Sequence, residues 1–231
     1  MEDSAELDER MLRFIEDEQH ATSACLGYHG YPKATCISIN EVVCHGIPRN
    51  QKLHMGDIVN IDVTVIKDGF HGDTSKMFVV GGHTTAHCQK LCDCARECLY
   101  AAIRRCRPGA DLTEIGDVIE PLAKRSGFSV VRDYCGHGLG RNFHELPQVL
   151  HYKNDEHLVL REGMTFTIEP MINAGTWKCK AKKKDGWTVF TADRRPSAQY
   201  EHTLAITATG CEVLTLRQEE DFPRVLNADN P

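Results

Sequence analysis

Residues 61–75 read IDVTVIKDGFHGDTS and carry the strongest structural signal in the chain. Apolar and polar residues alternate in the first part, and Asp68-Gly69 is a strong signal for a hairpin turn between two strands. A two-residue turn places Asp73 opposite Thr64, with Asp62 on the same sheet face two residues along. Two carboxylates held that close repel one another unless they are protonated or bridged by a cation. The alternative is an exposed face with two solvated acids, and the hairpin alone leaves both interpretations open.

Around this hairpin the sequence predicts three helices and several short strands. Apolar residues at helical spacing, with capping and stop signals, predict helices over residues 4–20, 88–107 and about 111–126, the last capped by Asp111 or Thr113. Strand-like runs follow one another over residues 34–43, 128–131, 163–172, 199–207 and 212–216. The last two are predicted to form a hairpin around Gly210. Helices and hairpins mix without a repeating strand-helix-strand order, which favours an α+β fold with mostly antiparallel sheet.

One pattern, an acidic helix followed by a strand, occurs twice, at residues 4–21 and 111–129. A long helix and Pro108-Gly109 precede the second copy, whereas nothing precedes the first. The chain also lacks a low-complexity linker of the kind that separates domains. It is therefore interpreted as one domain, residues 1–231, with two related halves at about 1–82 and 83–231.

The composition argues against several classes of protein. Asp plus Glu total 33 against 27 for Lys plus Arg, so a dedicated DNA-binding surface is not indicated. No apolar run approaches the roughly 20 residues that span a membrane, and the polar start lacks the pattern of a signal peptide. Eleven cysteines fit reduced thiols in a cytoplasmic protein better than a disulfide framework. Five of them fall within residues 88–107, where helical geometry keeps four from meeting at one zinc ion, so they are interpreted as small buried side chains.

Further acids and histidines occur at positions that suit a shared site. Glu169 ends the run MTFTI, and Glu201 lies within QYEHTL. Four acids at sheet positions in one small domain are harder to explain as solvated surface than any one of them alone. His137 lies between two glycines, His144 follows seven residues later, and His45 lies at a strand end. A lone histidine is more often a core or surface residue than a ligand, so residue type does not decide its role.

Together these motifs resemble those of the type 1 methionine aminopeptidases, the short bacterial-like form. The five metal ligands of that family match Asp62 and Asp73 in IDVTVIKDGFHGDTS, His137 in YCGHGLGRNFHELPQVLH, Glu169 in TFTIEPM and Glu201 in SAQYEHT. The resemblance runs from about residue 5 to about residue 216. It implies the pita-bread fold, which has two pseudo-symmetric halves around a curved antiparallel sheet, here apparently without the first family helix.

The resemblance also implies the role of each site residue. Two divalent ions, of Co, Mn, Fe(II) or Zn, are expected, with Asp73 and Glu201 bridging them. Glu169 is expected to act as general base, and His45 and His144 to bind substrate and stabilise charge that develops during the reaction. A methionine pocket is implied for six residues whose types alone favour ordinary core packing: Cys25, Tyr28, Tyr31, Cys36, Phe143 and Trp187.

The implied activity is metal-dependent removal of the initiator methionine from nascent proteins whose second residue is small. The implied setting is a cytoplasmic monomer that acts on nascent N-termini and associates transiently with the ribosome. Two alternatives stay open: another pita-bread peptidase, of the Xaa-Pro type, and a pita-bread protein that only binds partners. The first usually carries a further N-terminal domain, and the second usually loses metal ligands, all five of which this chain retains.

Overall fold

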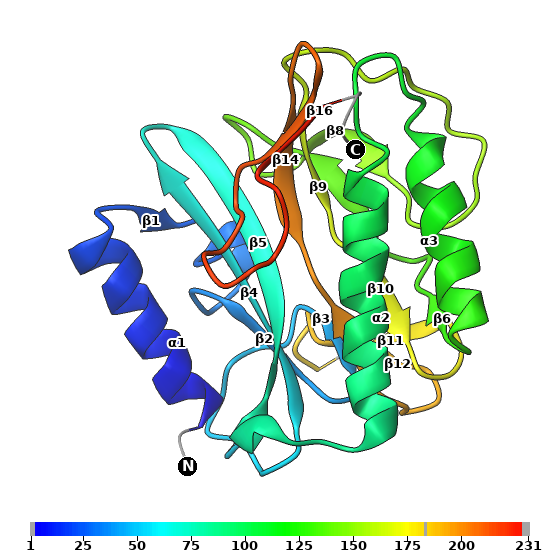
Figure 1. Cartoon of the computed structure of the whole chain (residues 1–231). Coiled ribbons are helices and arrows are strands. Elements are labelled where there is room, and N and C mark those ends of the chain that lie inside the picture. Colours follow the sequence, from blue (N-terminus) through cyan, green and yellow to red (C-terminus); the bar gives the residue numbers. More distant parts are fainter. Residues whose placement is uncertain (1–2, 183, 228–231) are drawn as a thin grey trace.

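A computed structural model describes residues 3–182 and 184–227 of the chain (Figure 1). Two groups of antiparallel strands lie side by side, with helix α1 on the outer side of the first and helices α2 and α3 on the outer side of the second (Figure 1). This arrangement confirms the predicted α+β class with antiparallel sheet. Within the described part of the chain, none of the helices has the length and apolar character that crossing a membrane requires.

The three predicted helices are present in the described residues, with small changes at their ends. Helix α1 spans Ser4–Arg13 and continues into a π-helical turn, Phe14–Glu18. Helix α2 spans Ala86–Ile103, and helix α3 spans Thr113–Arg125. Neither predicted cap is the N-cap of α3, because Leu112 holds that position. The Asp111 carboxylate instead accepts a hydrogen bond from the Thr113 backbone N–H, at 2.9 Å.

The strands are short except for the central hairpin. The first group holds the strands of the first half of the chain: β1 (Thr22–Ser23), β2 (Cys36–Ile39), β3 (Val42–Cys44), β4 (Ile58–Lys67) and β5 (Phe70–Val79). Strand β3 pairs with β12 of the second group, whereas the other four belong to one sheet. The second comprises β6 (Ser129–Val130), β7 (Gly136–Gly138), β8 (Glu145–Val149), β9 (Thr165–Ile168), β10 (Met171–Asn173), β11 (Cys179–Ala181), β12 (Val189–Thr191), β13 (Ser197–Gln199), β14 (His202–Ile206), β15 (Gly210–Val213) and β16 (Val225–Asn227). The predicted closing hairpin is confirmed as β14 and β15, with Gly210 as the first residue of its second strand.

The hairpin of β4 and β5 has the predicted register. Thr64 pairs with Asp73, and Asp62 pairs with Ser75 one step along the same face. Asp68 and Gly69 both have positive φ, 51° and 80°, as the favoured two-residue hairpin turn requires. The turn chemistry of these two residues therefore fixes the relative positions of the two aspartates.

Three predicted continuous strands are interrupted, and two of the interruptions hold acidic residues. The run 163–172 divides into β9 and β10 because Pro170 has no N–H with which to continue a ladder. Glu169 lies at this break. The run 199–207 divides in the same way between β13 and β14, with Glu201 at the break. The run 34–43 divides at Asn40, which has a φ of 52°.

The two halves of the molecule meet where β5 passes β14. Within the described residues, one isolated antiparallel bridge joins these strands, with Ser75 opposite Glu201. The Glu201 N–H donates to the Ser75 carbonyl at 3.0 Å. The Thr203 hydroxyl donates to the Asp73 carbonyl at 2.7 Å and accepts from the Asp73 N–H at 3.2 Å. Side chains thus replace part of the backbone ladder at this junction.

The largest core lies between helices α2 and α3 and the second group of strands. Leu91, Leu99, Ile119 and Phe166 are fully buried there. Burial of each such side chain contributes about 1.5–3 kcal/mol. The α2 cysteines lie in the same core as free thiols, and all but the partly exposed Cys88 are buried. Their interpretation as small buried side chains is confirmed for the buried ones.

Asp8 ties helix α1 to the segment that leads into β2. Its side chain is buried, and Oδ1 accepts hydrogen bonds from Ala34 N (3.1 Å), Thr35 N (2.9 Å) and the Thr35 hydroxyl (2.9 Å). Residue 36 follows directly in β2. Asp8 therefore fixes the start of a strand that lies beside Asp62, which pairs with Cys36.

Residues 214–222, called here the C-terminal strap, pass over the junction of β5 and β14, where Arg217 contacts Thr74 and Ser75. Glu220 of the strap accepts hydrogen bonds from the Tyr100 hydroxyl at 2.7 Å and from Arg217 N at 2.8 Å. Burial alone would raise its pKa. Hydrogen bonds from His202, Arg217 and Tyr100 outweigh burial and lower the pKa of Glu220 to about 2.

Replacing Asp8 by alanine leaves two buried backbone N–H groups without their acceptor. An unsatisfied buried donor costs about 1–3 kcal/mol, so we expect Asp8→Ala to lower the free energy of unfolding by about 3 kcal/mol. Chemical denaturation measures this change. Glu9→Ala, at an exposed position of the same helix, is the matched control and should change stability by less than about 0.5 kcal/mol. Equal effects of the two substitutions would refute the anchoring role.

Glu220 should make stability depend on pH. Its pKa is lowered on folding, so its contribution is fully present above the ordinary value of 4.5 and is lost as pH falls from there towards about 2. We expect Glu220→Gln to be clearly less stable than the unchanged protein at neutral pH. The difference should shrink as pH falls through this window. A difference in denaturation midpoint that stays constant from neutral pH down to about 2 would contradict the assignment.

Candidate active site

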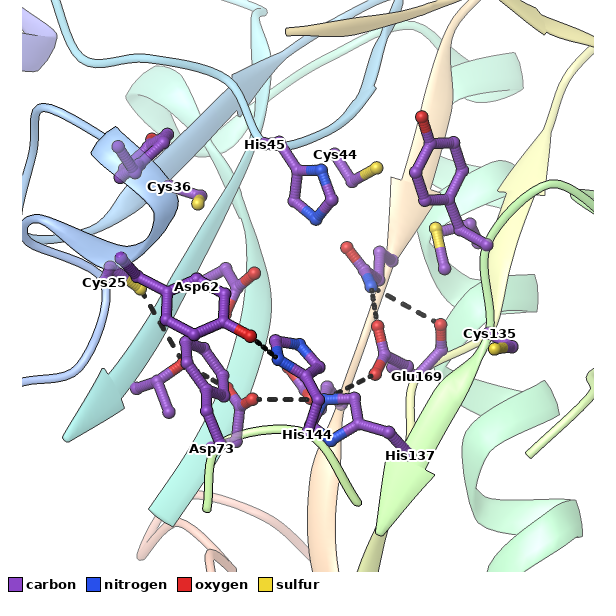
Figure 2. A pocket seen from close by; sticks show the side chains of 18 of the residues that line it. Cys25, Cys36, Cys44, His45, Asp62, Asp73, Cys135, His137, His144 and Glu169 are labelled. Atoms are coloured by element: carbon purple, nitrogen blue, oxygen red, sulfur yellow. Dashed lines mark hydrogen bonds and ion pairs between the residues drawn. The ribbon is translucent and has the colours of Figure 1, made fainter. Parts of the chain in front are cut away.

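A cavity of about 510 Å³ opens between the two halves of the molecule. All thirteen residues that the sequence analysis singled out for the site line it. They are Cys25, Tyr28, Tyr31, Cys36, His45, Asp62, Asp73, His137, Phe143, His144, Glu169, Trp187 and Glu201. Residues far apart in the sequence thus share one cavity. Figure 2 shows ten of the lining residues by name, with acids and imidazoles on facing elements.

The acids and one imidazole gather on one wall of the cavity. Asp73, His137 and Glu201 each offer a ligand atom, and these atoms lie within 4.8 Å of one another. His137 Nε2 is 3.6 Å from Asp73 Oδ2 and 3.6 Å from Glu169 Oε1 (Figure 2). Asp62 lies beside Asp73 on the same face of the hairpin. The sheet register and the two strand breaks therefore bring four carboxylates and an imidazole together.

The basic side chain beside these carboxylates is the imidazole of His137. No lysine or arginine occurs among the described residues that line the cavity. Burial raises the pKa of Asp62 and of Glu201 well above the ordinary values, and the charge of Asp73 raises both further. Burial also raises the pKa of Glu169 to about 7, against the attraction of His137. Such a cluster of hard oxygen donors with one nitrogen fits divalent metal ions.

His137 has the hydrogen bond that orients many metal-binding imidazoles. Its Nδ1 lies 3.0 Å from the carbonyl oxygen of Gly138. A carbonyl only accepts, so Nδ1 carries a hydrogen, and Nε2 is the ring nitrogen that faces the acids and would bind a cation after losing its own proton. Burial lowers the pKa of His137, but the hydrogen bond with Asp73 and the charge of Glu169 outweigh burial and raise it to about 9. The anionic neighbours Asp73 and Glu169 therefore favour the protonated, positively charged form of the ring.

The other two histidines are electrically different from His137. Burial and the nearby His137 lower the pKa of His144 to about 4, and burial lowers the pKa of His45. Both rings are therefore neutral at neutral pH. His144 Nδ1 lies 2.8 Å from the Tyr28 hydroxyl, whereas the His45 ring packs edge-on against Trp187, 6.1 Å away. Two neutral imidazoles thus reach the cavity from separate segments (Figure 2).

The six residues of the implied methionine pocket form an apolar end of the cavity. Cys25, Tyr31 and Cys36 make one buried cluster, against which Phe143 and Trp187 pack. The Tyr31 ring meets Trp187 edge-on at 5.1 Å. The Tyr31 hydroxyl lies within hydrogen-bond distance of two backbone carbonyls, at 3.0 and 3.1 Å, so its polar end is satisfied away from the cavity. These side chains therefore both line the cavity and pack against one another as a small core.

Three polar residues at the acid cluster were missed as site residues. The Thr64 hydroxyl donates to Asp73 Oδ1 and the Thr167 hydroxyl to Glu169 Oε1, both at 2.8 Å. Gln199 Nε2 donates to Glu169 Oε2 at 3.1 Å. In each case the position of the residue relative to a predicted ligand could have identified it. Thr64 is opposite Asp73 in the hairpin, and Thr167 and Gln199 each lie two residues before an acid of the cluster on the same strand face.

Comparison with known proteins places this geometry in a family. Residues 3–208 match the model of metallopeptidase family M24. The methionine aminopeptidase of Escherichia coli strain K12 is 60% identical over 228 residues, which are 98% of this chain and 86% of that protein. The crystal structure of methionine aminopeptidase from Rickettsia prowazekii aligns with a TM-score of 0.90 and 47% identity, covering 93% of this chain and 86% of that one. Prolidase from Pyrococcus furiosus aligns with a TM-score of 0.63 and 24% identity, over 80% of this chain and 49% of that one, a likeness of fold alone.

The chain therefore belongs to metallopeptidase family M24, a class of divalent-metal hydrolases. The predicted pita-bread fold is confirmed by the alignment with solved members of that family. Within it, the chain belongs to the methionine aminopeptidases.

The Tyr28 hydroxyl should fix the tautomer of His144. A phenol is a stronger donor than a neutral imidazole N–H, so we expect the hydroxyl to donate to Nδ1 and leave the hydrogen of His144 on Nε2. Long-range ¹H–¹⁵N spectra of histidine-labelled protein distinguish the two tautomers. In Tyr28→Phe, His144 should change from a single Nε2–H form to a mixture.

Tyr31→Phe is the matched control for this experiment. It removes a hydroxyl from the same cavity wall, but that hydroxyl bonds to backbone carbonyls rather than to a histidine. The His144 signals should therefore stay as in the unchanged protein. An unaltered His144 spectrum in Tyr28→Phe would show that Tyr28 does not set the tautomer.

Proposed function

We propose that this protein releases the N-terminal methionine of nascent polypeptides, using two divalent metal ions held by five side chains. The proposed ligands are Asp62, Asp73, His137, Glu169 and Glu201. The observation that carries the proposal is the convergence of four carboxylates and one imidazole in a cavity whose described lining includes no lysine or arginine. The similarity of nearly the whole chain to methionine aminopeptidases supports the same conclusion.

The donor set suits a pair of ions. Asp73 and Glu201 come from different halves of the molecule, and their ligand atoms lie within 4.8 Å of each other, so both carboxylates would be able to hold the same ions. Oxygen donors with one imidazole are compatible with Mn, Fe(II), Co or Zn. Bound divalent ions lower the pKa of water and polarise a carbonyl group, which supplies a nucleophile near neutral pH.

Three side chains are proposed to handle protons and charge. Glu169 is proposed as the general base because its carboxylate lies within the acid cluster, 3.6 Å from His137 Nε2. His144 is proposed to donate a hydrogen bond from Nε2 to the scissile carbonyl oxygen, while its Nδ1 accepts from the Tyr28 hydroxyl. His45, also neutral, reaches the cavity from another segment and is proposed to stabilise charge at the leaving nitrogen.

The apolar end of the cavity is proposed to hold the methionine side chain. A thioether makes favourable contacts with sulfur and with aromatic edges, and Cys25, Cys36, Phe143, Tyr31 and Trp187 offer both. Tyr28 completes this end through its contact with the Phe143 ring, 4.8 Å away. The nearby acids attract a free α-amino group, which would limit cleavage to the first residue of a chain.

The setting of the reaction is proposed on the same basis. A nascent N-terminus first becomes available at the ribosome, so transient association with ribosomes in the cytoplasm fits such a substrate. A monomer is proposed because one chain supplies all the proposed ligands. The requirement for a small second residue, which the family resemblance implies, belongs to the same proposal.

A peptide assay tests the function directly. Purified protein is given Met-Ala-Ser and a peptide with proline in second place, with added Mn²⁺ or with a chelator. We expect methionine release from Met-Ala-Ser with metal and at least a hundredfold less with chelator. Cleavage of the proline peptide alone would indicate an Xaa-Pro peptidase. Cleavage of neither peptide with any of the four metals would overturn the proposal.

Matched aspartate variants tie this assay to the proposed ligands. Asp73→Asn removes a proposed bridging carboxylate and should lower both bound metal and methionine release. Asp133→Asn changes another aspartate of the cavity lining, which accepts a hydrogen bond from Cys179 N rather than joining the acid cluster. It should retain both. Equal metal content in the two variants would argue against Asp73 as a ligand.

A further inference from the structure

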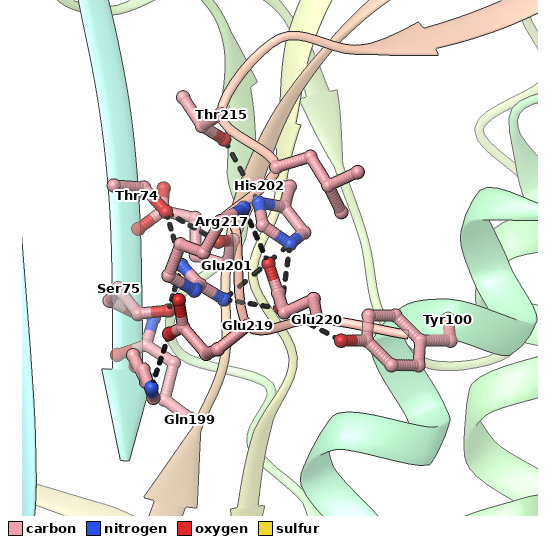
Figure 3. Close-up of polar contacts among 12 residues, drawn as sticks. Thr74, Ser75, Tyr100, Gln199, Glu201, His202, Thr215, Arg217, Glu219 and Glu220 are labelled. Carbon is pink, nitrogen blue, oxygen red and sulfur yellow. Dashed lines mark hydrogen bonds and ion pairs between the residues drawn. The ribbon is translucent and has the colours of Figure 1, made fainter. Parts of the chain in front are cut away.

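The C-terminal strap holds an arginine against the junction where two proposed ligands meet. Figure 3 shows Arg217 between strand β5 and Glu220. Arg217 Nη1 donates to the Thr74 hydroxyl at 2.8 Å and to the Ser75 carbonyl at 3.4 Å. Both acceptors directly follow Asp73 in β5.

The same two acceptors also hold the backbone of Glu201. The Thr74 hydroxyl donates to the Glu201 carbonyl at 2.9 Å, and the Glu201 N–H donates to the Ser75 carbonyl at 3.0 Å. Arg217 therefore contacts both groups that bind the peptide units of Glu201. One guanidinium thus joins the strand of Asp73 to the strand of Glu201.

Arg217 is itself held in place by buried partners. Its Nη2 donates to Glu220 Oε1 at 2.9 Å, and its backbone N–H donates to Glu220 Oε2 at 2.8 Å. The side chain of Arg217 is 17% exposed, and that of Glu220 is 8% exposed. Glu220 is bonded in turn by the hydroxyl of Tyr100, which comes from helix α2. Charge-assisted hydrogen bonds in such a setting are short and directional.

The junction needs this support because its backbone pairing is sparse. Asp73 and Glu201 come from different halves of the molecule, and in the described chain an isolated bridge joins their strands. Metal ligands must be held to within about 0.5 Å of the productive geometry. We propose that Arg217 is a positioning residue of the metal site, which fixes the spacing of Asp73 and Glu201 through Thr74 and Ser75. This inference rests on the proposed role of those two acids as ligands.

The contacts favour a geometric effect of Arg217 over an effect of its charge. Glu220 neutralises the guanidinium at close range, and Arg217 is absent from the lining of the cavity. A lysine keeps the charge but has a single donor group in place of the planar fork. A geometric role therefore predicts that Arg217→Lys fails in the same way as Arg217→Met.

The test is metal binding by the full chain after removal of bound ions. Mn²⁺ is titrated by calorimetry into the unchanged protein, Arg217→Met, Arg217→Lys and Thr74→Val, well below the unfolding temperature of each. Loss of residues that orient metal ligands typically weakens binding 10–100-fold, and we expect about tenfold or more in all three variants. The absorption spectrum of the Co²⁺-loaded variants should also change, because it reports ligand geometry.

Lys76→Met is the matched control for these variants. Lys76 forms an ion pair with Glu219 and so also links the strap to β5, but this pair does not contact Thr74 or Ser75. Its affinity for Mn²⁺ and its Co²⁺ spectrum should be unchanged. If Arg217→Met does not fold, Arg217→Lys still tests the proposal because it keeps the charge but replaces the planar fork.

The possible outcomes separate this inference from the proposed function. If the unchanged protein takes up no Mn²⁺, the metal site itself is wrong. If it binds Mn²⁺ and the three variants bind with the same affinity and the same Co²⁺ spectrum, the positioning role is overturned while the metal site stands. Recovery of normal affinity in Arg217→Lys would replace the geometric role with one of charge.

Discussion

The mutual repulsion of four carboxylates, two of them buried and two partly buried, is the constraint on which the site depends. Asp62, Asp73, Glu169 and Glu201 share one wall of a cavity whose described lining offers no lysine or arginine. Burial makes their charges costly and raises the pKa of three of them. A fold keeps such a cluster only if something else neutralises it, and divalent cations do so with the geometry that hard oxygen donors prefer. Membership of a metallopeptidase family agrees with this need for cations beside the four acids.

Two of the four acids lie where predicted strands are interrupted, between β9 and β10 and between β13 and β14. The first half supplies two aspartates from a regular hairpin, whose turn sets their register. The second half supplies two glutamates from breaks where a strand leaves one sheet and joins another. At such breaks the backbone loses ladder partners, and side chains take their place. His151, for example, accepts a hydrogen bond from Glu169 N at 3.1 Å. Irregular backbone therefore occurs at the two glutamates, whereas the two aspartates lie in regularly paired strands.

Polarity is divided sharply within one cavity. One end is apolar and rich in sulfur and aromatic rings, and the other is anionic. Two neutral histidines lie between these ends, and their pKa values are lowered by burial. This division gives a hydrophobic side chain and a charged amino group different places to bind. Hydrogen-bond networks outside the cavity support the strands that line it. Asp8 binds residues 34–35 before β2, and the C-terminal strap binds β5.

Much of this protein was accessible from the pattern of its residues. The turn Asp68-Gly69 and the alternation around it predicted the register of Asp62 and Asp73, because a hairpin is a local structure. The helices were predicted for the same reason, and the thirteen proposed site residues were found through long motifs that resemble a family. The breaks in the strands were missed at Asn40, at residues 200–201 and even at Pro170, as was the site role of Gln199. The Arg217 network was missed as well, because its members lie up to 143 residues apart and no local pattern links them. Contacts between the two halves arise only when the chain folds, since they depend on packing rather than on neighbouring residues.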